Sequence, residues 1–242
     1  MKAMILAAGR GTRLGSLGET IPKVLIEIDG RPLLERHLNY LERNGIRRVV
    51  VNAHHHAAQI ASFAETYGGS IDLTVVVEDR LLGTAGGVRN ALGQLQPGPF
   101  FVLYGDVLID APIEPLLTLH RETNACATLA VHEAGSAEGK GVVEVDDGGR
   151  VQAFTEKSSE AKGPFLINSG LYVLEPELVS HLAPGRESDF GTDVFPAALQ
   201  RGLPLYATRL AQPVIDIGTP EGLTLARATV RAQALESEPG LR

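Results

Sequence analysis

A short apolar run at 3–7 leads into Leu6-Ala7-Ala8-Gly9-Arg10-Gly11-Thr12-Arg13-Leu14, and Pro22-Lys23-Val24-Leu25 follows soon after. A strand that runs directly into closely spaced glycines is typical of a phosphate-binding loop, because backbone N–H groups can then approach phosphate oxygens. The two arginines add positive charge, and Pro22 fixes the backbone beside Lys23, which adds a third cation. The stretch therefore predicts a buried first strand followed by an anion-binding loop.

Two alternatives compete for this loop. The first is a plain strand-to-loop turn with solvated arginines, because short glycine motifs have many false positives. The second is the dinucleotide fingerprint G-x-G-x-x-G, which places an acid near the end of the second strand. Here the third glycine is late, at Gly15, and the second apolar run ends at Asn52-Ala53-His54 without a carboxylate. We therefore reject NAD binding, whereas the glycines alone leave the plain turn open.

Apolar runs alternate with helical patterns through the first half of the chain. Strands are expected at 3–7, 47–52, 72–77, 99–104 and 126–132, and helices over 31–44, 57–67, 85–95 and from Asp110, with Pro112 at the first helical position. This alternation predicts an α/β fold with a Rossmann-like, doubly wound, mostly parallel sheet. Ligands of such sheets lie beyond the carboxyl ends of the strands, here in the loops after Ala7, Val77 and Tyr104.

The second half changes to an antiparallel pattern. A β-hairpin is expected over 141–155, further strands at 165–174, 203–208 and 214–217, and helices over 190–201 and 220–234. We expect one domain over 1–242, in which 136–235 forms an insertion and closing helices beside the active edge of the sheet. Residues 236–242 are expected to form a tail, and no β-helix is expected after it.

The net charge and the cysteine count of the chain argue against some classes of binding partner and cellular location. The 242 residues include 22 Lys and Arg against 29 Asp and Glu, which gives a net charge of −7. This balance argues against nucleic acid or an anionic membrane as partner, because both bind a concentrated basic face. The single cysteine, Cys126, can form neither an internal disulfide nor a thiolate metal cage, which favours a reducing, cytoplasmic location.

The glycine loop with Pro22-Lys23 resembles the signature of the sugar-1-phosphate nucleotidylyltransferases, also called NDP-sugar pyrophosphorylases. The resemblance continues in family order through 82–87, Gly105-Asp106, 154–157, 168–172 and 216–220. Each motif is weak alone, but six in order over nearly the whole chain are specific. The resemblance implies the nucleotide-diphospho-sugar transferase fold, with a nucleotide-binding half at 1–135 and a small sugar-binding insertion at 136–235. It also implies that a nucleoside triphosphate and a sugar 1-phosphate react to form an NDP-sugar and pyrophosphate.

The resemblance also implies roles for individual positions. Lys23 and Arg13 would act on the triphosphate as catalytic residues, and Asp106 and Asp216 would hold Mg²⁺, which prefers oxygen ligands. The nucleotide-binding positions are Leu6, Ala8, Gly9, Gly11, Thr12, Gly83, Thr84, Ala85 and Gly86. The sugar-phosphate-binding positions are Gly141, Glu156, Lys157 and Asn168.

Several of these residues have a purely structural alternative. Asp106 could be a turn residue, and Asp216 could cap the last helix, although Thr219 is better placed to do so. Glu156-Lys157 could be a solvated strand end, and Asn168 could satisfy a strand-edge backbone group. Three successive histidines, 54–56, cannot all face one ion from a strand or helix, so we interpret them as a turn.

One position at which this chain differs from many members of the family bears on the identity of the nucleotide base. Uridylyl and thymidylyl relatives often carry Gln where this chain has Leu81, which favours GTP. Residues 189–195 look closest to guanylyltransferases for mannose- or heptose-type sugar phosphates. A UTP-dependent enzyme for an N-acetyl-hexosamine or N-acetylmuramate 1-phosphate and a non-catalytic nucleotide-sugar sensor remain alternatives. A homodimer through 190–201 or the last helix is also open.

Overall fold

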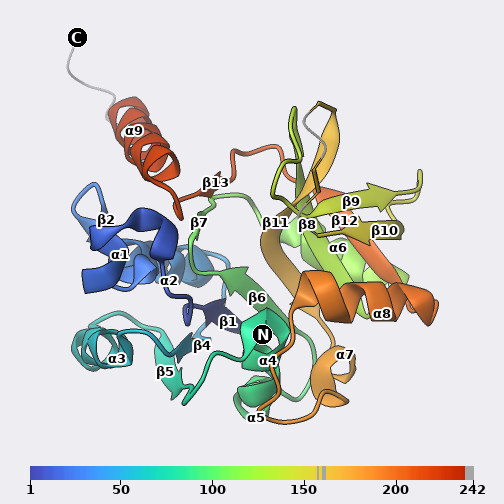
Figure 1. Ribbon diagram of the computed structural model, residues 1–242, viewed down its shortest axis with the longest axis horizontal. Helices are drawn as coiled ribbons and strands as arrows, with labels where there is room; N and C mark the ends of the chain where they lie inside the picture. The colour runs from blue at the N-terminus through green and yellow to red at the C-terminus, as the bar shows by residue number, and fades with distance from the viewer. Residues whose placement is uncertain (157, 160–161, 238–242) are drawn as a thin grey trace.

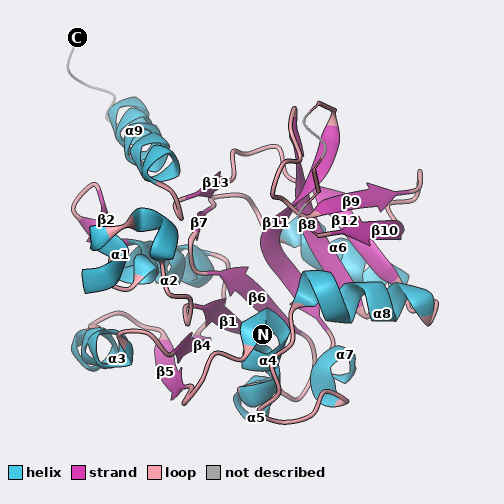
Figure 2. Cartoon of the chain, viewed as in Figure 1, coloured by secondary structure: helices cyan, strands magenta, loops and turns pink. Residues whose placement is uncertain are grey.

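The computed structural model describes residues 1–156, 158–159 and 162–237 (Figures 1 and 2). The strands are β1 (Lys2–Leu6), β2 (Glu27–Ile28), β3 (Arg31–Pro32), β4 (Arg48–Ala53), β5 (Asp72–Val77), β6 (Phe100–Tyr104), β7 (Val107–Leu108), β8 (Ala127–Ala134), β9 (Val142–Val145), β10 (Val151–Thr155), β11 (Phe165–Leu174), β12 (Leu205–Arg209) and β13 (Ile215–Asp216). The α-helices are α1 (Ser16–Thr20), α2 (Leu33–Arg43), α3 (Ala57–Thr66), α4 (Gly83–Asn90), α5 (Leu92–Leu95), α6 (Glu114–Thr123), α7 (Glu177–Ser180), α8 (Phe195–Gln200) and α9 (Pro220–Ser237). Short 3-10 turns cover Thr12–Leu14 and Lys23–Leu25, and a π turn covers Phe190–Val194.

The first half of the chain contains the parallel strands β1, β4, β5 and β6, and in the second half β12 pairs in parallel with β8. In the described chain the main sheet runs β10-β9-β11-β6-β1-β4-β5, with β8 beside β11 and β12 beside β8. Strand β1 pairs in parallel with β4 and β6, and β4 pairs in parallel with β5. The long β11 runs antiparallel to β6, β8 and β9. The predicted parallel sheet is confirmed in the first half, and antiparallel strands extend it on one side (Figure 2).

Strand β1 is buried on both faces, as a central parallel strand should be. Met4 packs on one face with side chains from α4, α5, α7 and α8. Ala3 and Ile5 pack on the other face with side chains from α2, α3 and α6. Because successive side chains of a strand point to opposite faces, three residues of one short strand join two apolar cores. The two-layer covering predicted from the alternating pattern is confirmed.

Helix α9 packs against the N-terminal segments. Leu223 and Val230 join a third apolar cluster with Ile28 and Leu33, and the guanidinium of Arg227 donates to the Glu27 carbonyl at 3.3 Å. The helix, which follows the second half in sequence, therefore lies beside α1 and β2 of the first half (Figure 1). No helix in the described residues is both long and apolar enough to cross a lipid bilayer.

Two helix boundaries differ from the prediction. The helix expected from Asp110 begins at Glu114, with Pro115 rather than Pro112 in its first turn. Residues 109–113 alternate between buried and exposed, which is an extended pattern, and the Tyr40 hydroxyl donates to the Ala111 carbonyl at 2.9 Å. The helix expected over 85–95 begins earlier, at Gly83, and is divided into α4 and α5.

Candidate active site

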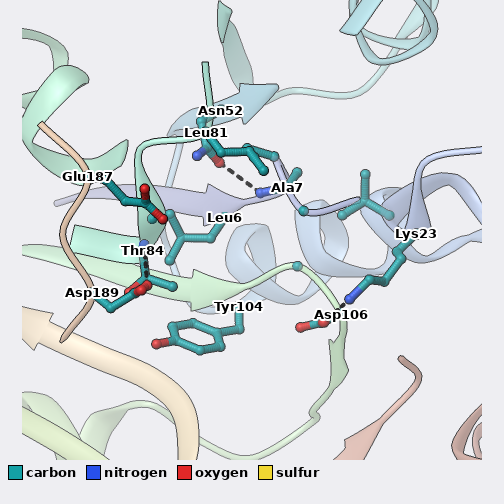
Figure 3. Close-up of a pocket in the computed structure, with 15 residues that line it drawn as sticks. Leu6, Ala7, Lys23, Asn52, Leu81, Thr84, Tyr104, Asp106, Glu187 and Asp189 are labelled. Carbon is teal, nitrogen blue, oxygen red and sulfur yellow. Dashed lines mark hydrogen bonds and ion pairs between the residues drawn. The ribbon is translucent and has the colours of Figure 1, made fainter. Parts of the chain in front are cut away.

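A pocket of about 290 Å³ opens at the carboxyl ends of the parallel strands (Figure 3). Its walls come from 6–9 after β1, from Asn52 at the end of β4, from 81–84 before α4, and from 104–106 after β6. Residues of the later segment 187–189 complete it. The expected location is therefore confirmed: the loops after β1, β5 and β6 meet at one edge of the sheet.

The glycine loop is shaped by backbone contacts that need glycine. Gly11 has a φ of +70°, and a Cβ at Gly18 would collide with the Gly11 carbonyl oxygen. The N–H groups of Ala8, Gly9 and Arg10 donate to no group among the described residues, whereas the Ala7 N–H donates to the Asn52 Oδ1 at 2.7 Å. The loop thus presents consecutive backbone donors at the mouth of the pocket.

Lys23 and Asp106 face each other at one end of the pocket (Figure 3). The Lys23 Nζ lies 2.5 Å from the Asp106 Oδ2, and the two side chains are 16% and 26% exposed. The glycine before Asp106 lets the loop after β6 lie against the end of β1: the Gly105 N–H donates to the Leu6 carbonyl at 2.9 Å, and a Cβ on Gly105 would lie 2.5 Å from that oxygen. The Asp106 carboxylate is therefore directed at a cation within the site.

Asp216 is placed beside Asp106 by a two-stranded ribbon. Asp216 in β13 pairs opposite Val107 in β7, and the Ile217 N–H donates to the Asp106 carbonyl at 2.9 Å. The Arg13 Nη2 lies 3.4 Å from the Asp216 Oδ2, and both side chains are more than half exposed. The helix-capping alternative for Asp216 fails, because Thr219 accepts the Gly222 N–H at the start of α9.

The pair of carboxylates fits a magnesium ion that also takes substrate phosphates and water as ligands. Magnesium is commonly bound by one or two carboxylates with the remaining positions filled by substrate and water. Among the described residues no group of three or more His, Cys, Asp or Glu side chains could hold a metal alone. The histidines at 54–56 form a turn, as interpreted from the sequence, and the His54 Nδ1 bonds with the Glu78 carbonyl oxygen at 2.8 Å.

At the other end of the pocket, segment 188–190 closes the start of α4. The backbone N–H and the hydroxyl of Thr84 both donate to the Asp189 Oδ1, at 2.8 and 2.9 Å. The N–H groups of Ala85 and Gly86 both donate to the Ser188 carbonyl at 2.9 Å. The first donors of this helix are thus satisfied by the protein, and only Gly83 and Thr84 of the predicted helix-start residues line the pocket.

Two residues missed by the sequence reasoning form a buried network beneath the pocket. Asn52 and Glu78 are 2% and 3% exposed, and the Asn52 Nδ2 donates to the Glu78 Oε1 at 2.7 Å. Glu78 also accepts the Leu82 N–H at 3.2 Å, and burial raises the pKa of its carboxyl group. Because Asn52 also holds Ala7, the network ties β1, β4 and β5 to the start of α4. The signal in the sequence is a polar residue near the end of each of two apolar strand runs, Asn52 in β4 and Glu78 directly after β5.

Aromatic side chains connect the pocket to the second half. The Tyr104 ring, which lines the pocket, packs edge-on against Tyr172 with 5.6 Å between the ring centroids, and burial raises the pKa of Tyr104 to about 12. Asn168 donates from Nδ2 to the Tyr172 hydroxyl at 2.6 Å. Its backbone N–H donates to the Gly141 carbonyl at 2.9 Å. Its Oδ1 accepts the Gly170 N–H at 3.1 Å, so the alternative in which the Asn168 side chain satisfies a strand backbone group also applies.

The predicted sugar-phosphate residues come together in part. A Cβ on Gly141 would lie 3.1 Å from the Glu156 Oε2, and a Cβ on Gly191 would collide with the same carboxylate. Gly141 therefore adjoins both Glu156 and Asn168. Lys157 lies outside the described residues. Of the predicted nucleotide-binding residues, Leu6, Ala8, Gly9, Gly83 and Thr84 line the pocket, whereas Gly11, Thr12, Ala85 and Gly86 do not. Of the predicted catalytic and metal-binding residues, Lys23 and Asp106 line the pocket, whereas Arg13 and Asp216 do not.

Comparison with known proteins shows the relatives of this chain. The model of the nucleotidyl transferase family matches residues 2–233. A UTP–glucose-1-phosphate uridylyltransferase from Synechocystis sp. is 37% identical, over 90% of this chain and 60% of its own length. A mannose-1-phosphate guanylyltransferase from Mycobacterium tuberculosis is 33% identical, over 99% of this chain and 67% of its own. The chain thus spans about two thirds of the length of these curated relatives.

A solved structure of similar length is also related. HddC from Yersinia pseudotuberculosis, crystallised in complex with GMP-PN, is 26% identical and superposes with a TM-score of 0.82. The match covers 95% of this chain and 99% of that one. The likeness therefore includes both halves of the fold.

Proposed function

The chain belongs to the nucleotidyl transferase family, among the sugar-1-phosphate nucleotidylyltransferases, and on that premise we propose that it joins a nucleoside triphosphate to a sugar 1-phosphate. An oxygen of the sugar phosphate attacks the α-phosphorus, the bond to the β-phosphate oxygen breaks, and pyrophosphate leaves. Both reactants are anions, so the protein has to align them and offset negative charge at the reacting phosphorus.

One observation carries the proposal: two cation–carboxylate pairs adjoin a loop of backbone donors. Lys23 with Asp106 and Arg13 with Asp216 are brought together by β7 and β13. Asp106 and Asp216 would hold Mg²⁺, which when bound would offset phosphate charge. Lys23 and Arg13 would bind the triphosphate, and the N–H groups of the glycine loop would orient its oxygens.

GTP and a mannose- or heptose-type sugar 1-phosphate are the proposed substrates. The Mycobacterium relative is named for guanylyl transfer and HddC was crystallised with a guanine nucleotide, which supports GTP. The Synechocystis relative, named for UTP, supports a uridylyltransferase as the second candidate. We place the reaction in the cytoplasm. A homodimer through α9 stays a prediction, for which Leu225 offers an apolar side chain that is 56% exposed.

Pyrophosphate release tests the proposed reaction. ATP, GTP, CTP, UTP and dTTP are each supplied with Mg²⁺ and mannose, heptose, glucose or N-acetyl-hexosamine 1-phosphate. We expect release with one triphosphate, and a loss on the order of 100-fold or more in kcat for Lys23→Ala. Arg121→Ala, an exposed cation on α6 outside the pocket, is the control.

The same variants separate an enzyme from a nucleotide-sugar sensor. If the chain is an enzyme, Lys23→Ala loses turnover far more than it loses the nucleotide-dependent rise in melting temperature. Unchanged turnover in Lys23→Ala contradicts the site. Nucleotide binding without pyrophosphate release, for every pair of substrates, favours the sensor.

A further inference from the structure

The base-binding end of the pocket contains one polar side chain that the protein does not use. The other polar side chains at this end contact groups of the protein: Asn52 is hydrogen-bonded to Ala7 and Glu78, Thr84 is hydrogen-bonded to Asp189, and the Tyr104 ring packs edge-on against Tyr172. These side chains therefore stabilise the structure of the site.

Glu187 differs from these residues. It lines the same pocket and is exposed, and among the described residues it has no hydrogen-bond or ion-pair partner. Figure 3 shows its carboxylate on the side of the pocket occupied by Thr84 and Asp189, with Lys23 and Asp106 toward the opposite side. Because the cations mark the phosphate end, Glu187 lies where the base of a nucleotide would be.

The surroundings of Glu187 suit a flat, largely apolar ring with a polar edge. Leu6 and Leu81 line the pocket near this carboxylate and offer aliphatic contacts. An ionised carboxylate only accepts hydrogen bonds, and its two oxygens bind best to two adjacent donors. The chemistry of this end therefore selects a base that presents two neighbouring N–H groups on one edge.

Guanine alone among the common bases has that edge, with N1–H next to the N2 amino group. Uracil and thymine present a single N–H between two carbonyl oxygens, and adenine and cytosine present an amino group beside an unprotonated ring nitrogen. On uracil, thymine, adenine and cytosine, one oxygen of the carboxylate would therefore face a lone pair of the base and be repelled. A site built around one hydrogen-bonding pattern rejects analogues that lack it.

We propose that Glu187 is the residue that selects guanine, by accepting hydrogen bonds from N1–H and N2–H of the base through its two carboxylate oxygens. This inference rests on the proposed nucleotidyl transfer and names the residue that determines its base. Asp189 is not the selector, because its Oδ1 already accepts two hydrogen bonds from Thr84.

Inosine triphosphate, which is GTP without the N2 amino group, provides the test. The ratio of kcat/KM for GTP to that for ITP is measured in the wild type, in Glu187→Gln and in Glu65→Gln, an exposed glutamate on α3 outside the pocket. We expect the wild type to prefer GTP by about tenfold or more, and Glu187→Gln to lose on the order of 10- to 100-fold with GTP. The GTP-to-ITP ratio of Glu187→Gln should fall close to one, and Glu65→Gln should match the wild type.

Several results would overturn the inference. If Glu187→Gln keeps both the wild-type rate and the wild-type ratio, Glu187 does not read the base. If the wild type uses UTP in preference to GTP, the inference fails while the proposed transfer stands. If no triphosphate reacts, the proposed function fails, and calorimetric binding of GTP and ITP to the same three proteins then decides the role of Glu187. Because Glu187 is exposed, its variants should keep the wild-type melting temperature, and Glu187→Asp serves as a second variant with the charge retained.

Discussion

The two ends of the pocket are built on different principles. At the base end, Asn52 and Glu78 are almost fully buried, are hydrogen-bonded to each other, and accept the backbone N–H groups of Ala7 and Leu82. At the phosphate end, charged side chains neutralise one another, and the Arg13–Asp216 pair is more than half exposed. A buried hydrogen-bond network, such as the Asn52 amide with the Glu78 carboxyl group, holds the loops in one conformation. Exposed ion pairs contribute little stability and can exchange partners. The shape of the base end therefore depends on buried hydrogen bonds, whereas the phosphate end depends on the charges of its side chains.

The largest expected effect tests the phosphate end. Asp106→Asn should lower kcat by about 10²- to 10³-fold, because it removes a charge at the reacting phosphates and the partner that orients Lys23. Asp216→Asn should lower kcat less and should raise the Mg²⁺ concentration needed for half-maximal rate. Chelating the metal should abolish the reaction in all three proteins.

The control for these variants is Asp110→Asn, an exposed carboxylate paired with Arg43 outside the pocket. Asp216→Asn should change the melting temperature little, because its pair with Arg13 is more than half exposed and exposed ion pairs contribute little stability. If a site variant loses much stability but keeps the wild-type kcat, the charges at the phosphate end serve folding and not the reaction, which contradicts the contrast between the two ends.

The next effect tests the base end. Asn52→Ala leaves the Ala7 N–H and the Glu78 carboxylate without their buried partner, so the free energy of unfolding should fall by about 2–4 kcal/mol. Chemical denaturation measures this free energy. The comparison variant is Asn44→Ala, which removes an asparagine at the C-terminal end of α2, outside the pocket. A change below about 0.5 kcal/mol, the usual surface value, would show that the network does not hold the loops.

The smallest effect is a difference in pH dependence between the two ends. His37 lies beneath the phosphate end, 1% exposed, and its Nε2–H donates to the Val107 carbonyl at 2.8 Å. Burial lowers the pKa of His37 to about 4, so the folded state resists a proton that the unfolded state accepts from about pH 6.5. Stability should therefore fall as pH decreases from 6.5 to 4, by about 2 kcal/mol at pH 5 from this group.

Glu78 should act in the opposite direction. Because burial raises its pKa, the folded state ionises later than the unfolded state, and stability is lost as pH rises through the folded-state value. Unfolding free energies measured between pH 4 and 8 should lose their acid-side slope in His37→Gln and keep it in Glu78→Gln. Equal slopes in His37→Gln and the wild type would contradict the role given to His37.

The sequence was enough to predict the parallel strands and the edge of the sheet where the pocket opens, because both depend on local patterns of apolar periodicity and glycine spacing. Roles for Lys23 and Asp106 were implied by the family resemblance, and the 2.5 Å contact between the two side chains was not predicted. The closure of α4 was not predictable, because Thr84 and Asp189 lie 105 residues apart and neither belongs to a pattern that names the other. Asn52 and Glu78 were missed for the same reason, and the packing of α9 depends on apolar residues that would look alike in any amphipathic helix.

The position of α9 has a consequence for how the chain acquires its structure. The helix covers apolar residues near Ile28 and Leu33, and its Arg227 bonds to a carbonyl 200 positions earlier. Ribosomal synthesis delivers those early segments first, so Ile28 and Leu33 remain uncovered by α9 until that helix has been synthesised. Contacts this distant in sequence are slow to form, because the intervening loop must be closed first. The parallel strands can assemble before α9 is synthesised, whereas the N-terminal segments that carry the glycine loop and Lys23 gain their apolar cover only when α9 packs against them.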